Sequence, residues 1–239
     1  MFVEYADAKG FSPLDIHKAN KKSSVLAAEF TQDTLLSSSP TNFEKWLPFA
    51  AESYQISKNP KDYVLVPIIT IPAGLPNRNG VAFPLSSLIE WAPDHGMQAY
   101  RTFVGKPMFE EHANADHTKA LGVIVDAALR PMRGFQGNLW KLLKLGAIDR
   151  FKNPEIADAV LRNEINSYSM GAYVERYTCS YCGAEMGQCS HIDKRRARDF
   201  YLLNGQLVFR NVHGIVGFET SVVRVPAFVS AVSDTLIQL

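Results

Sequence analysis

The stretch NSYSMGAYV, from Asn166 to Val174, decides the fold that this sequence predicts. Polar and apolar residues alternate through it, which is typical of a strand with one buried face. The stretch presents the small hydroxyl of Ser169 and, two residues later, Gly171, which permits close backbone approach. A serine nucleophile needs this arrangement, although a half-buried strand serine bonded to a neighbour shows the same pattern. Ser167 also stands where a nucleophile elbow has its first glycine.

The length and composition are those of an ordinary globular protein. The 239 residues are 46% hydrophobic and 21% charged, which favours one main domain. A formal net charge of +1 creates no overall field that would attract nucleic acid or an anionic membrane. The first residues do not resemble a secretion signal, and Pro67 and Pro72 interrupt the longest apolar run. We therefore expect neither export nor membrane insertion.

Residues 1 to about 60 are less regular than the rest, and we interpret them as an N-terminal extension of a domain that spans 61–239. Within the extension, a helix is expected from Asn42 to about Gln55 despite Pro48. The β-branched run between Asp62 and Ile71 then predicts a buried strand, the first of the domain.

Between Gly105 and Leu129 the pattern is strand, polar loop, strand. His112 stands at the end of the first strand, and the loop contains Asp116 and His117. An imidazole in this position can meet a nucleophile from another strand. An ordinary surface histidine fits the same pattern.

The second half of the chain supplies further strands and helices. The amphipathic spacing from Leu139 to Ile148 predicts a helix, and a second helix is expected from Asn153 to about Arg162. Asn204-Gly205 predicts a type I′ hairpin, and Gly214 to Ala227 a final strand. Several strands and a few helices without regular alternation favour an α+β fold, with a mainly antiparallel sheet or barrel and helices outside.

All three cysteines fall in one short stretch with a histidine: Cys179, Cys182, Cys189 and His191. Cys-X-X-Cys followed by Gly is typical of a zinc knuckle, and the second ligand pair returns after a short loop, with a tighter spacing than usual. Clustered cysteines of this kind indicate a reducing, cytoplasmic compartment rather than a disulfide framework. We expect structural zinc in an insert at about 177–198, because four protein ligands would close the coordination sphere.

A basic run from Lys194 to Arg198 follows the cysteines. Beside a zinc knuckle, such a run is compatible with phosphate contacts, and hence with a non-catalytic capsid, scaffold or nucleic-acid-binding module. No aromatic residues are interleaved for base stacking, so we favour a solvated surface and expect no nucleic-acid partner.

Five motifs follow one another between residues 62 and 231. They are Asn77-Arg78-Asn79-Gly80 with Phe83-Pro84, Val104-Gly105-Lys106-Pro107 with His112, Gly122-Val123-Ile124-Val125-Asp126, Ser169-Met170-Gly171, and Glu219-Thr220-Ser221-Val222-Val223 with Pro226-Ala227. In this order they resemble the prohead (head maturation) proteases of tailed bacteriophages, which are similar in fold to the herpesvirus assemblins. The resemblance implies a small, mainly antiparallel closed β-barrel with surrounding helices.

The same resemblance implies a serine endopeptidase that works inside the immature capsid, in the host cytoplasm. Its expected substrates are the phage scaffold or core proteins, the major capsid protein and the protease itself. Ser169 matches the nucleophile of the family and His112 its general base. Glu219 falls at the acidic position of the last motif and is expected to orient the imidazole, with Asp116, His117 and His213 as alternatives.

No side chain stands out as an oxyanion donor. Backbone N–H groups near Gly171 or in the turn at 130–134 are expected to serve. Arg130 and Arg133 are alternatives that would act through a bound water, as arginines do in the herpesvirus relatives, although solvated loop charges fit both positions.

Two Ala-Ala-Glu triplets end at Glu29 and Glu52. Several prohead proteases that this sequence resembles cleave after a Glu preceded two residues earlier by a small or aliphatic side chain, so self-cleavage at these sites would trim the extension. The triplet is also common helix composition. A homodimer is expected by analogy with the herpesvirus relatives, and an inert capsid or scaffold protein that keeps the fold is a further alternative.

Overall fold

The structure is a computed structural model that describes residues 2–4, 41–132, 139–193, 200–228 and 231. The basic run at 194–198, Arg133 and the triplet that ends at Glu29 lie outside these residues. No helix in the described part of the chain has both the length and the apolar composition needed to cross a membrane.

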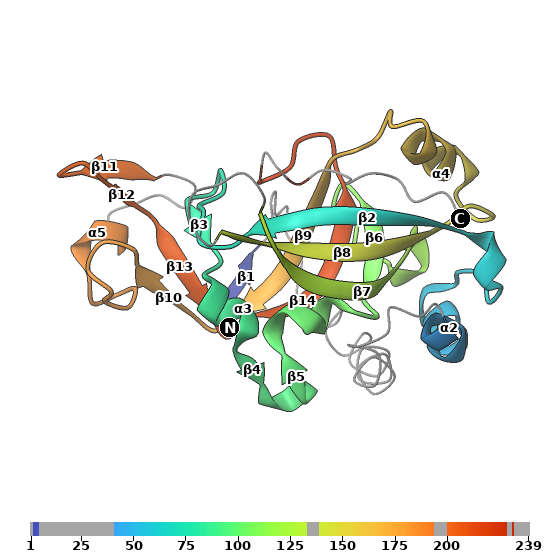
Figure 1. Cartoon of the computed structure of the whole chain (residues 1–239), viewed down its shortest axis with the longest axis horizontal. Helices are drawn as coiled ribbons and strands as arrows, with labels where there is room; N and C mark the ends of the chain where they lie inside the picture. The colour runs from blue at the N-terminus through green and yellow to red at the C-terminus, as the bar shows by residue number, and fades with distance from the viewer. Residues whose placement is uncertain (1, 5–40, 133–138, 194–199, 229–230, 232–239) are drawn as a thin grey trace.

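A seven-stranded mixed sheet forms the body of the protein (Figure 1). Neighbouring strands run antiparallel, except that β14 and β6 run parallel. In sheet order, the strands are β1 Phe2–Glu4, β9 Tyr168–Val174, β14 Val216–Val222, β6 Pro107–Glu110, β7 Gly122–Pro131, β8 Trp140–Asp149 and β2 Tyr63–Pro72.

This sheet curls into a half-barrel. Figure 1 shows β2, β8 and β7 side by side, with β9 and β14 running at a steep angle to them. β2 approaches β9, but the hydrogen-bonded ladder of the described strands ends at β1 on one side and at β2 on the other. The expected α+β class and mainly antiparallel pairing are therefore present, whereas closure into a barrel is not seen in the described residues.

The helix expected from Leu139 to Ile148 is wrong, because these residues form most of strand β8. Leucines at helical spacing suggested one apolar stripe, but β8 lies between β7 and β2, with burial that alternates through Leu145 and is continuous from Gly146 to Asp149. Lys144 is fully buried, so a lysine occupies a position where strand alternation would show an apolar residue. The charge at that position concealed the strand pattern.

The helices lie around the sheet. Among the described residues they are α2 Thr41–Tyr54, α3 Leu85–Ile89, α4 Pro154–Leu161 and α5 Ser190–Asp193, with 3-10 turns η1 Pro60–Asp62, η2 Pro93–His95, η3 Ala99–Phe103 and η4 His117–Lys119. A small hairpin pairs β4 Trp91–Ala92 with β5 Met97–Gln98. The helices expected near Asn42 and Asn153 are thus confirmed.

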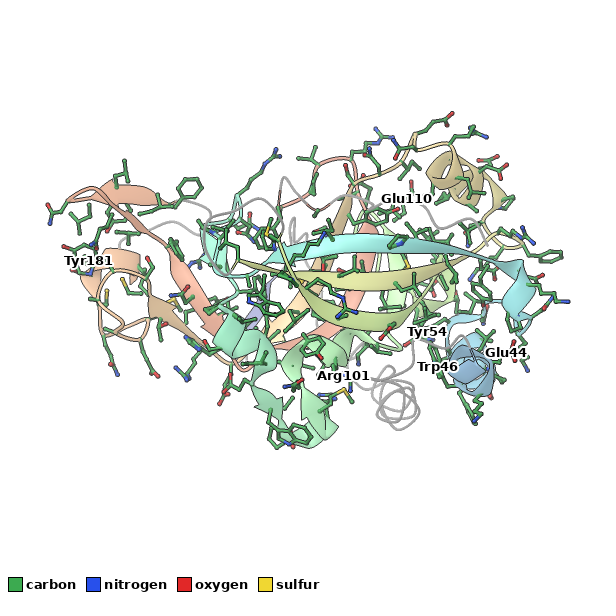
Figure 2. All side chains as sticks on the ribbon, in the orientation of Figure 1. Glu44, Trp46, Tyr54, Arg101, Glu110 and Tyr181 are labelled. Atoms are coloured by element: carbon green, nitrogen blue, oxygen red, sulfur yellow. The ribbon has the colours of Figure 1, made fainter. Side chains whose placement is uncertain are left out.

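Helix α2 packs into the main core. Trp46 and Tyr54, labelled in Figure 2, are buried together with Leu47 and Ala50, and the Tyr54 hydroxyl donates to the carbonyl of Gly105 at 3.1 Å. The part of the expected N-terminal extension that the structure describes is therefore folded against the domain.

A smaller lobe holds the cysteines. It comprises a three-stranded sheet in the order β10-β13-β3, the hairpin β11–β12 and α5, with a local core of its own around Cys179, Ile192 and Val208. The strands are β3 Val81–Ala82, β10 Arg176–Cys179, β11 Tyr201–Leu203, β12 Gln206–Val208 and β13 Arg210–His213. Asn204 and Gly205 have φ of 51° and 76°, the signs that the expected type I′ turn requires.

Candidate functional site

The pairing of β9 with β14 brings the candidate serine and glutamate together. Ser169 lies opposite Ser221, and Gly171 lies opposite Glu219. Directly opposed residues share one face of a sheet, as do residues two apart on one strand. Ser169, Gly171, Glu219 and Ser221 therefore occupy the same face, which we call the serine face.

Gly171 is the residue that lets Glu219 approach β9. A Cβ atom at position 171 would lie 2.8 Å from Glu219 Oε1 and 2.4 Å from Cζ of Phe218, both closer than real Cβ atoms come. The sequence indicated that another group comes close to the backbone at Gly171, and in the structure that group includes the Glu219 carboxylate.

His112 reaches the serine face from the end of β6. This strand runs parallel to β14, with Glu110 opposite Val222. Glu111 and His112 then take positive φ values of 47° and 57°, which are uncommon for residues with side chains and often mark functional positions. The resulting turn directs the imidazole back toward β14.

The His112 imidazole and the Glu219 carboxylate are hydrogen-bonded. His112 Nδ1 lies 2.8 Å from Glu219 Oε1, and the two side chains are 6% and 0% exposed. With an ionised carboxylate, Nδ1 carries the proton and donates, which leaves Nε2 as the basic nitrogen. This is the tautomer that a general base for a serine requires.

Ser221 is a site residue that the sequence analysis did not single out. Its hydroxyl donates to Glu219 Oε2 at 2.5 Å, so both carboxylate oxygens have partners. Ser221 is fully buried, and Ser169 opposite it is 5% exposed. The spacing of Glu219 and Ser221, two residues apart in a strand, was the signal that could have paired them.

The alternative partners for His112 lie elsewhere. His213 contacts Ser87 Oγ at 3.1 Å through Nδ1 and Thr178 Oγ1 at 2.8 Å through Nε2, and burial lowers its pKa. Asp116 caps η4 by accepting from the N–H and hydroxyl of Thr118, and these bonds lower its pKa.

His117 is exposed in the same turn, η4. Of the four acceptors or bases weighed from the sequence, Glu219 is hydrogen-bonded to His112. Arg130, an alternative oxyanion contact, is an exposed residue at the end of β7 opposite Lys141.

Two lysines are buried in the body of the fold. Lys144 of β8 donates through Nζ to Thr220 Oγ1 at 2.9 Å and lies 3.4 Å from the centre of the Phe103 ring. Burial lowers the pKa of Lys144 well below its ordinary value, and the Glu219 carboxylate opposes this shift. Thr220 alternates with Glu219 and Ser221 along β14, so Lys144 supports this strand from the face opposite the serine face.

Lys106, just before β6, is also fully buried, and no described residue offers its Nζ a hydrogen-bond partner. Burial lowers its pKa to about 7. The sequence analysis quoted Lys106 only as part of a motif, and its burial is not visible from composition.

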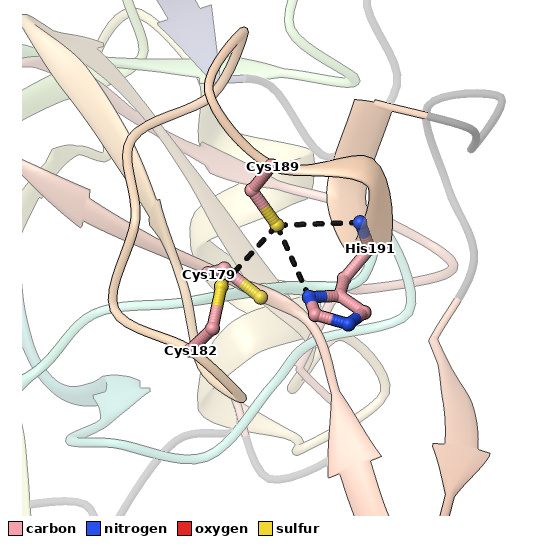
Figure 3. Close-up of side chains that lie close together, drawn as sticks. All are labelled: Cys179, Cys182, Cys189 and His191. Carbon is pink, nitrogen blue, oxygen red and sulfur yellow. Dashed lines mark hydrogen bonds between the residues drawn. The ribbon is translucent and has the colours of Figure 1, made fainter.

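The predicted metal ligands come together in the smaller lobe (Figure 3). One donor atom from each of Cys179, Cys182, Cys189 and His191 lies within 4.8 Å of all the others. Cys189 Sγ is 3.4 Å from Cys182 Sγ and 3.3 Å from His191 Nδ1. Four donors around a tetrahedral zinc stand about 3.5–3.8 Å apart, because Zn–S and Zn–N bonds are about 2.3 and 2.1 Å long. The cluster could hold a metal ion of this kind.

The cysteine environment also favours ligation. Burial works against ionisation of Cys189, but hydrogen bonds from the Ile192 and His191 N–H groups and from the Cys182 thiol lower its pKa to about 7. Since the thiolate is the form that binds metal, these contacts prepare the thiol for coordination.

A separate pocket of about 680 Å³ lies at the other end of β9 and β14. Its lining includes Glu90, Trp91, Glu175 and Val216, and none of His112, Ser169 and Glu219. Glu175 directly follows β9, and Val216 lies opposite Tyr173, so the pocket borders the end of β9 that is far from Ser169.

Comparisons of this chain with models of known protein families, with curated proteins and with solved structures found no match.

Proposed function

We propose that this protein is a serine endopeptidase in which Ser169 is the nucleophile, His112 the general base and Glu219 the residue that orients His112. The observation that carries the proposal is the hydrogen bond of 2.8 Å between His112 Nδ1 and Glu219 Oε1, on the face of the sheet that also carries Ser169. A buried carboxylate on Nδ1 holds the imidazole in the basic tautomer and stabilises the imidazolium that forms during attack.

The reaction follows from these roles. As Ser169 Oγ bonds to the scissile carbonyl carbon, His112 Nε2 takes the hydroxyl proton and the carbonyl oxygen becomes an oxyanion. Collapse of this intermediate breaks the C–N bond, and the imidazolium gives its proton to the leaving amine. Water then attacks the ester carbonyl of the acylated Ser169 while His112 Nε2 takes its proton. The imidazolium returns a proton to Ser169 Oγ as the acyl group leaves as a carboxylic acid.

The order of the five sequence motifs supports a more specific proposal, namely a protease of the phage prohead. Its substrates would be the scaffold or core proteins and the major capsid protein, cleaved after Glu in small- or aliphatic-X-Glu sequences. The curled, mainly antiparallel sheet is compatible with the closed barrel of the assemblin relatives, and a homodimer belongs to the same proposal.

Self-cleavage remains part of the proposal, with a structural condition at Glu52. This residue is exposed within α2, whereas Ala50 and Ala51 before it are buried. A protease needs the scissile segment extended, so cleavage after Glu52 would require α2 to unfold locally. The site after Glu29 lies outside the described residues.

The Cys179, Cys182, Cys189 and His191 cluster supports a structural zinc site. With four protein donors and no open position, a zinc ion there would stabilise the lobe rather than activate water. This separate lobe also supports the second candidate function, a zinc-stabilised capsid, scaffold or nucleic-acid-binding module without catalysis.

Co-expression with the major capsid and scaffold proteins of the same phage, followed by intact-mass spectrometry, tests the two candidates. The protease proposal predicts cleavage after Glu by the wild type and by Ser86→Ala, a control at an exposed serine of α3, and none by Ser169→Ala. Ser221→Ala identifies the nucleophile, since it should slow cleavage without abolishing it. Unchanged masses with folded, assembled wild-type protein would favour the non-catalytic module.

A further inference from the structure

The outer edge of β9 has a partner in this structure that comes from the beginning of the sequence. β9 pairs with β14 on one side and with the three-residue strand β1 on the other. The pairing is antiparallel, with Phe2 opposite Val174 and Glu4 opposite Ala172. β1 therefore runs along the strand that carries Ser169, in the direction of Ser169.

The backbone of β9 shows which groups face this edge. The Ser167 carbonyl accepts from Val223 N–H at 3.0 Å on the β14 side, whereas Tyr168 N–H donates to the Ala231 carbonyl at 2.8 Å. Backbone groups of successive residues point to opposite sides of a strand. Tyr168, Met170, Ala172 and Val174 thus present their N–H and C=O groups to the outer edge.

A strand added at this edge would pass the candidate nucleophile. Neighbouring strands lie about 4.8 Å apart, so a chain paired with Met170 would run alongside Ser169. Strand addition to a sheet edge is a general way to hold an extended peptide, because backbone hydrogen bonds provide affinity without requiring one sequence. An endopeptidase needs its substrate extended in this manner.

The present occupant is short. β1 contributes three residues, and a pairing of this length is only marginally stable by itself. An occupant that is held weakly at a substrate edge can be displaced by a longer peptide that also pairs beyond Ala172.

We propose that the outer edge of β9, from Met170 to Val174, is the strand-addition site for the polypeptide substrate, and that Phe2–Glu4 occupies part of it as an internal competitor. The substrate enters antiparallel to β9, displaces β1 and brings its scissile carbonyl to Ser169. The statement that the added strand is a substrate rests on the proposed protease function. The statement that β1 competes with an added peptide for the edge of β9 does not.

Proline substitutions in the full chain separate pairing from other effects of β1. The alternation on β9 implies that Phe2 and Glu4 direct their backbone groups toward β9 and that Val3 directs its own away. Glu4→Pro removes an N–H that pairs with β9, and Val3→Pro, the matched control, removes one that faces outward, which an edge strand tolerates.

Two measurements that do not depend on catalysis follow. Hydrogen exchange at the Ala172 and Val174 amides should accelerate by about tenfold or more in Glu4→Pro, and by less than about threefold in Val3→Pro. A fluorescein-labelled synthetic peptide with the sequence of residues 1–9, added to each protein, should bind Glu4→Pro with a Kd about tenfold lower than it binds the wild type, because the competitor is weakened. The same peptide N-methylated at Glu4 should not bind, whereas N-methylation at Val3 should be tolerated.

The assignment of the edge would be overturned if the Ala172 and Val174 amides exchanged at equal rates in the wild type, Glu4→Pro and Val3→Pro. It would also be overturned if the two N-methylated peptides bound equally. Cleavage of the co-expressed proteins distinguishes the two proposals. Peptide binding without any cleavage would retain the edge and reject the protease. Cleavage at equal rates in all three proteins, without peptide binding, would retain the protease and reject the edge.

Discussion

Glu219 Oε1 lies 2.8 Å from His112 Nδ1, although the two residues are separated by 107 positions in the sequence. The contact depends on the parallel pairing of β6 with β14 and on two successive positive-φ residues after β6. The pairing places the end of β6 beside β14, and the two positive-φ residues turn the chain so that the imidazole lies against the carboxylate. The backbone strain of the two positive-φ residues supports a functional role for the pair.

Glu219→Gln tests that role. The amide keeps the approximate shape but cannot stabilise an imidazolium, and it can favour the wrong tautomer of His112. We expect the kcat/KM of whichever substrate the wild type cleaves to fall by a factor on the order of 10³–10⁴. Glu155→Gln, on the exposed side of α4, is the matched control and should leave kcat/KM unchanged. A Glu219→Gln variant with wild-type kcat/KM would show that His112 does not need the carboxylate.

Gly171→Ala tests the close approach of β9 to Glu219 and Phe218. The added methyl would lie 2.4 Å from Phe218 Cζ and 2.8 Å from Glu219 Oε1, so neighbouring atoms must move. We expect the free energy of unfolding, measured by urea titration, to fall by about 1–3 kcal/mol.

Phe218→Leu combined with Gly171→Ala should recover part of this loss, since it removes the nearer obstacle. Strictly additive effects of the two substitutions would mean that the glycine is not required by this contact.

Metal binding by the smaller lobe is directly measurable. We expect one Zn²⁺ per chain by elemental analysis, and a tetrahedral thiolate absorption spectrum when Co²⁺ replaces it. Cys182→Ser should lose the metal, while Glu185→Gln in the same loop should retain it. A chelator should raise hydrogen exchange in β10 and α5 and leave β7 and β8 protected. Full metal occupancy in Cys182→Ser would remove this residue from the ligand set.

Lys106 predicts a pH dependence of stability. Its pKa is lowered in the folded protein from 10.5 to about 7, so between these values the unfolded chain holds a proton that the folded protein lacks. Raising the pH removes this advantage of the unfolded state, and the free energy of unfolding should rise by up to about 1.4 kcal/mol per pH unit in that window.

Lys106→Met should be more stable than the wild type near neutral pH and should show a smaller rise of stability with pH, with part of the rise kept by Lys144. The exposed Lys119→Met is the control, and urea titrations at about pH 7, 8 and 9 are the measurement. Parallel pH profiles for Lys106→Met and the wild type would contradict the prediction.

Local signals in the sequence predicted several parts of this structure. The Ser169 strand, the hairpin at Asn204, the helix near Asn153 and the convergence of the four metal ligands all depend on short-range patterns, and each is present. The pairing of His112 with Glu219 was expected from the resemblance to a family, since no pattern within the sequence connects residues so far apart.

The misassigned segment and the overlooked residues involve polar side chains that are buried. Lys144 and Lys106 are charged residues in fully buried positions, and Ser221 is a small hydroxyl in a strand. Sequence patterns treat charge as a sign of exposure, so β8 was expected to be a helix with a polar face. Tertiary contacts with Thr220 and Phe103, which no local pattern contains, make the buried position of Lys144 tolerable.

Apart from β3, the smaller lobe lies in the sequence between β9 and β14, the two strands that carry Ser169 and Glu219. Residues 175–215 must therefore be spanned before these neighbouring strands can pair. The entropic cost of closing such a loop falls by about 0.6 kcal/mol for each halving of its effective length. Any cross-link within the lobe, a bound metal included, shortens that length. Metal loading of the lobe should therefore favour the pairing of β9 with β14, and with it the assembly of the cluster that we propose to be catalytic.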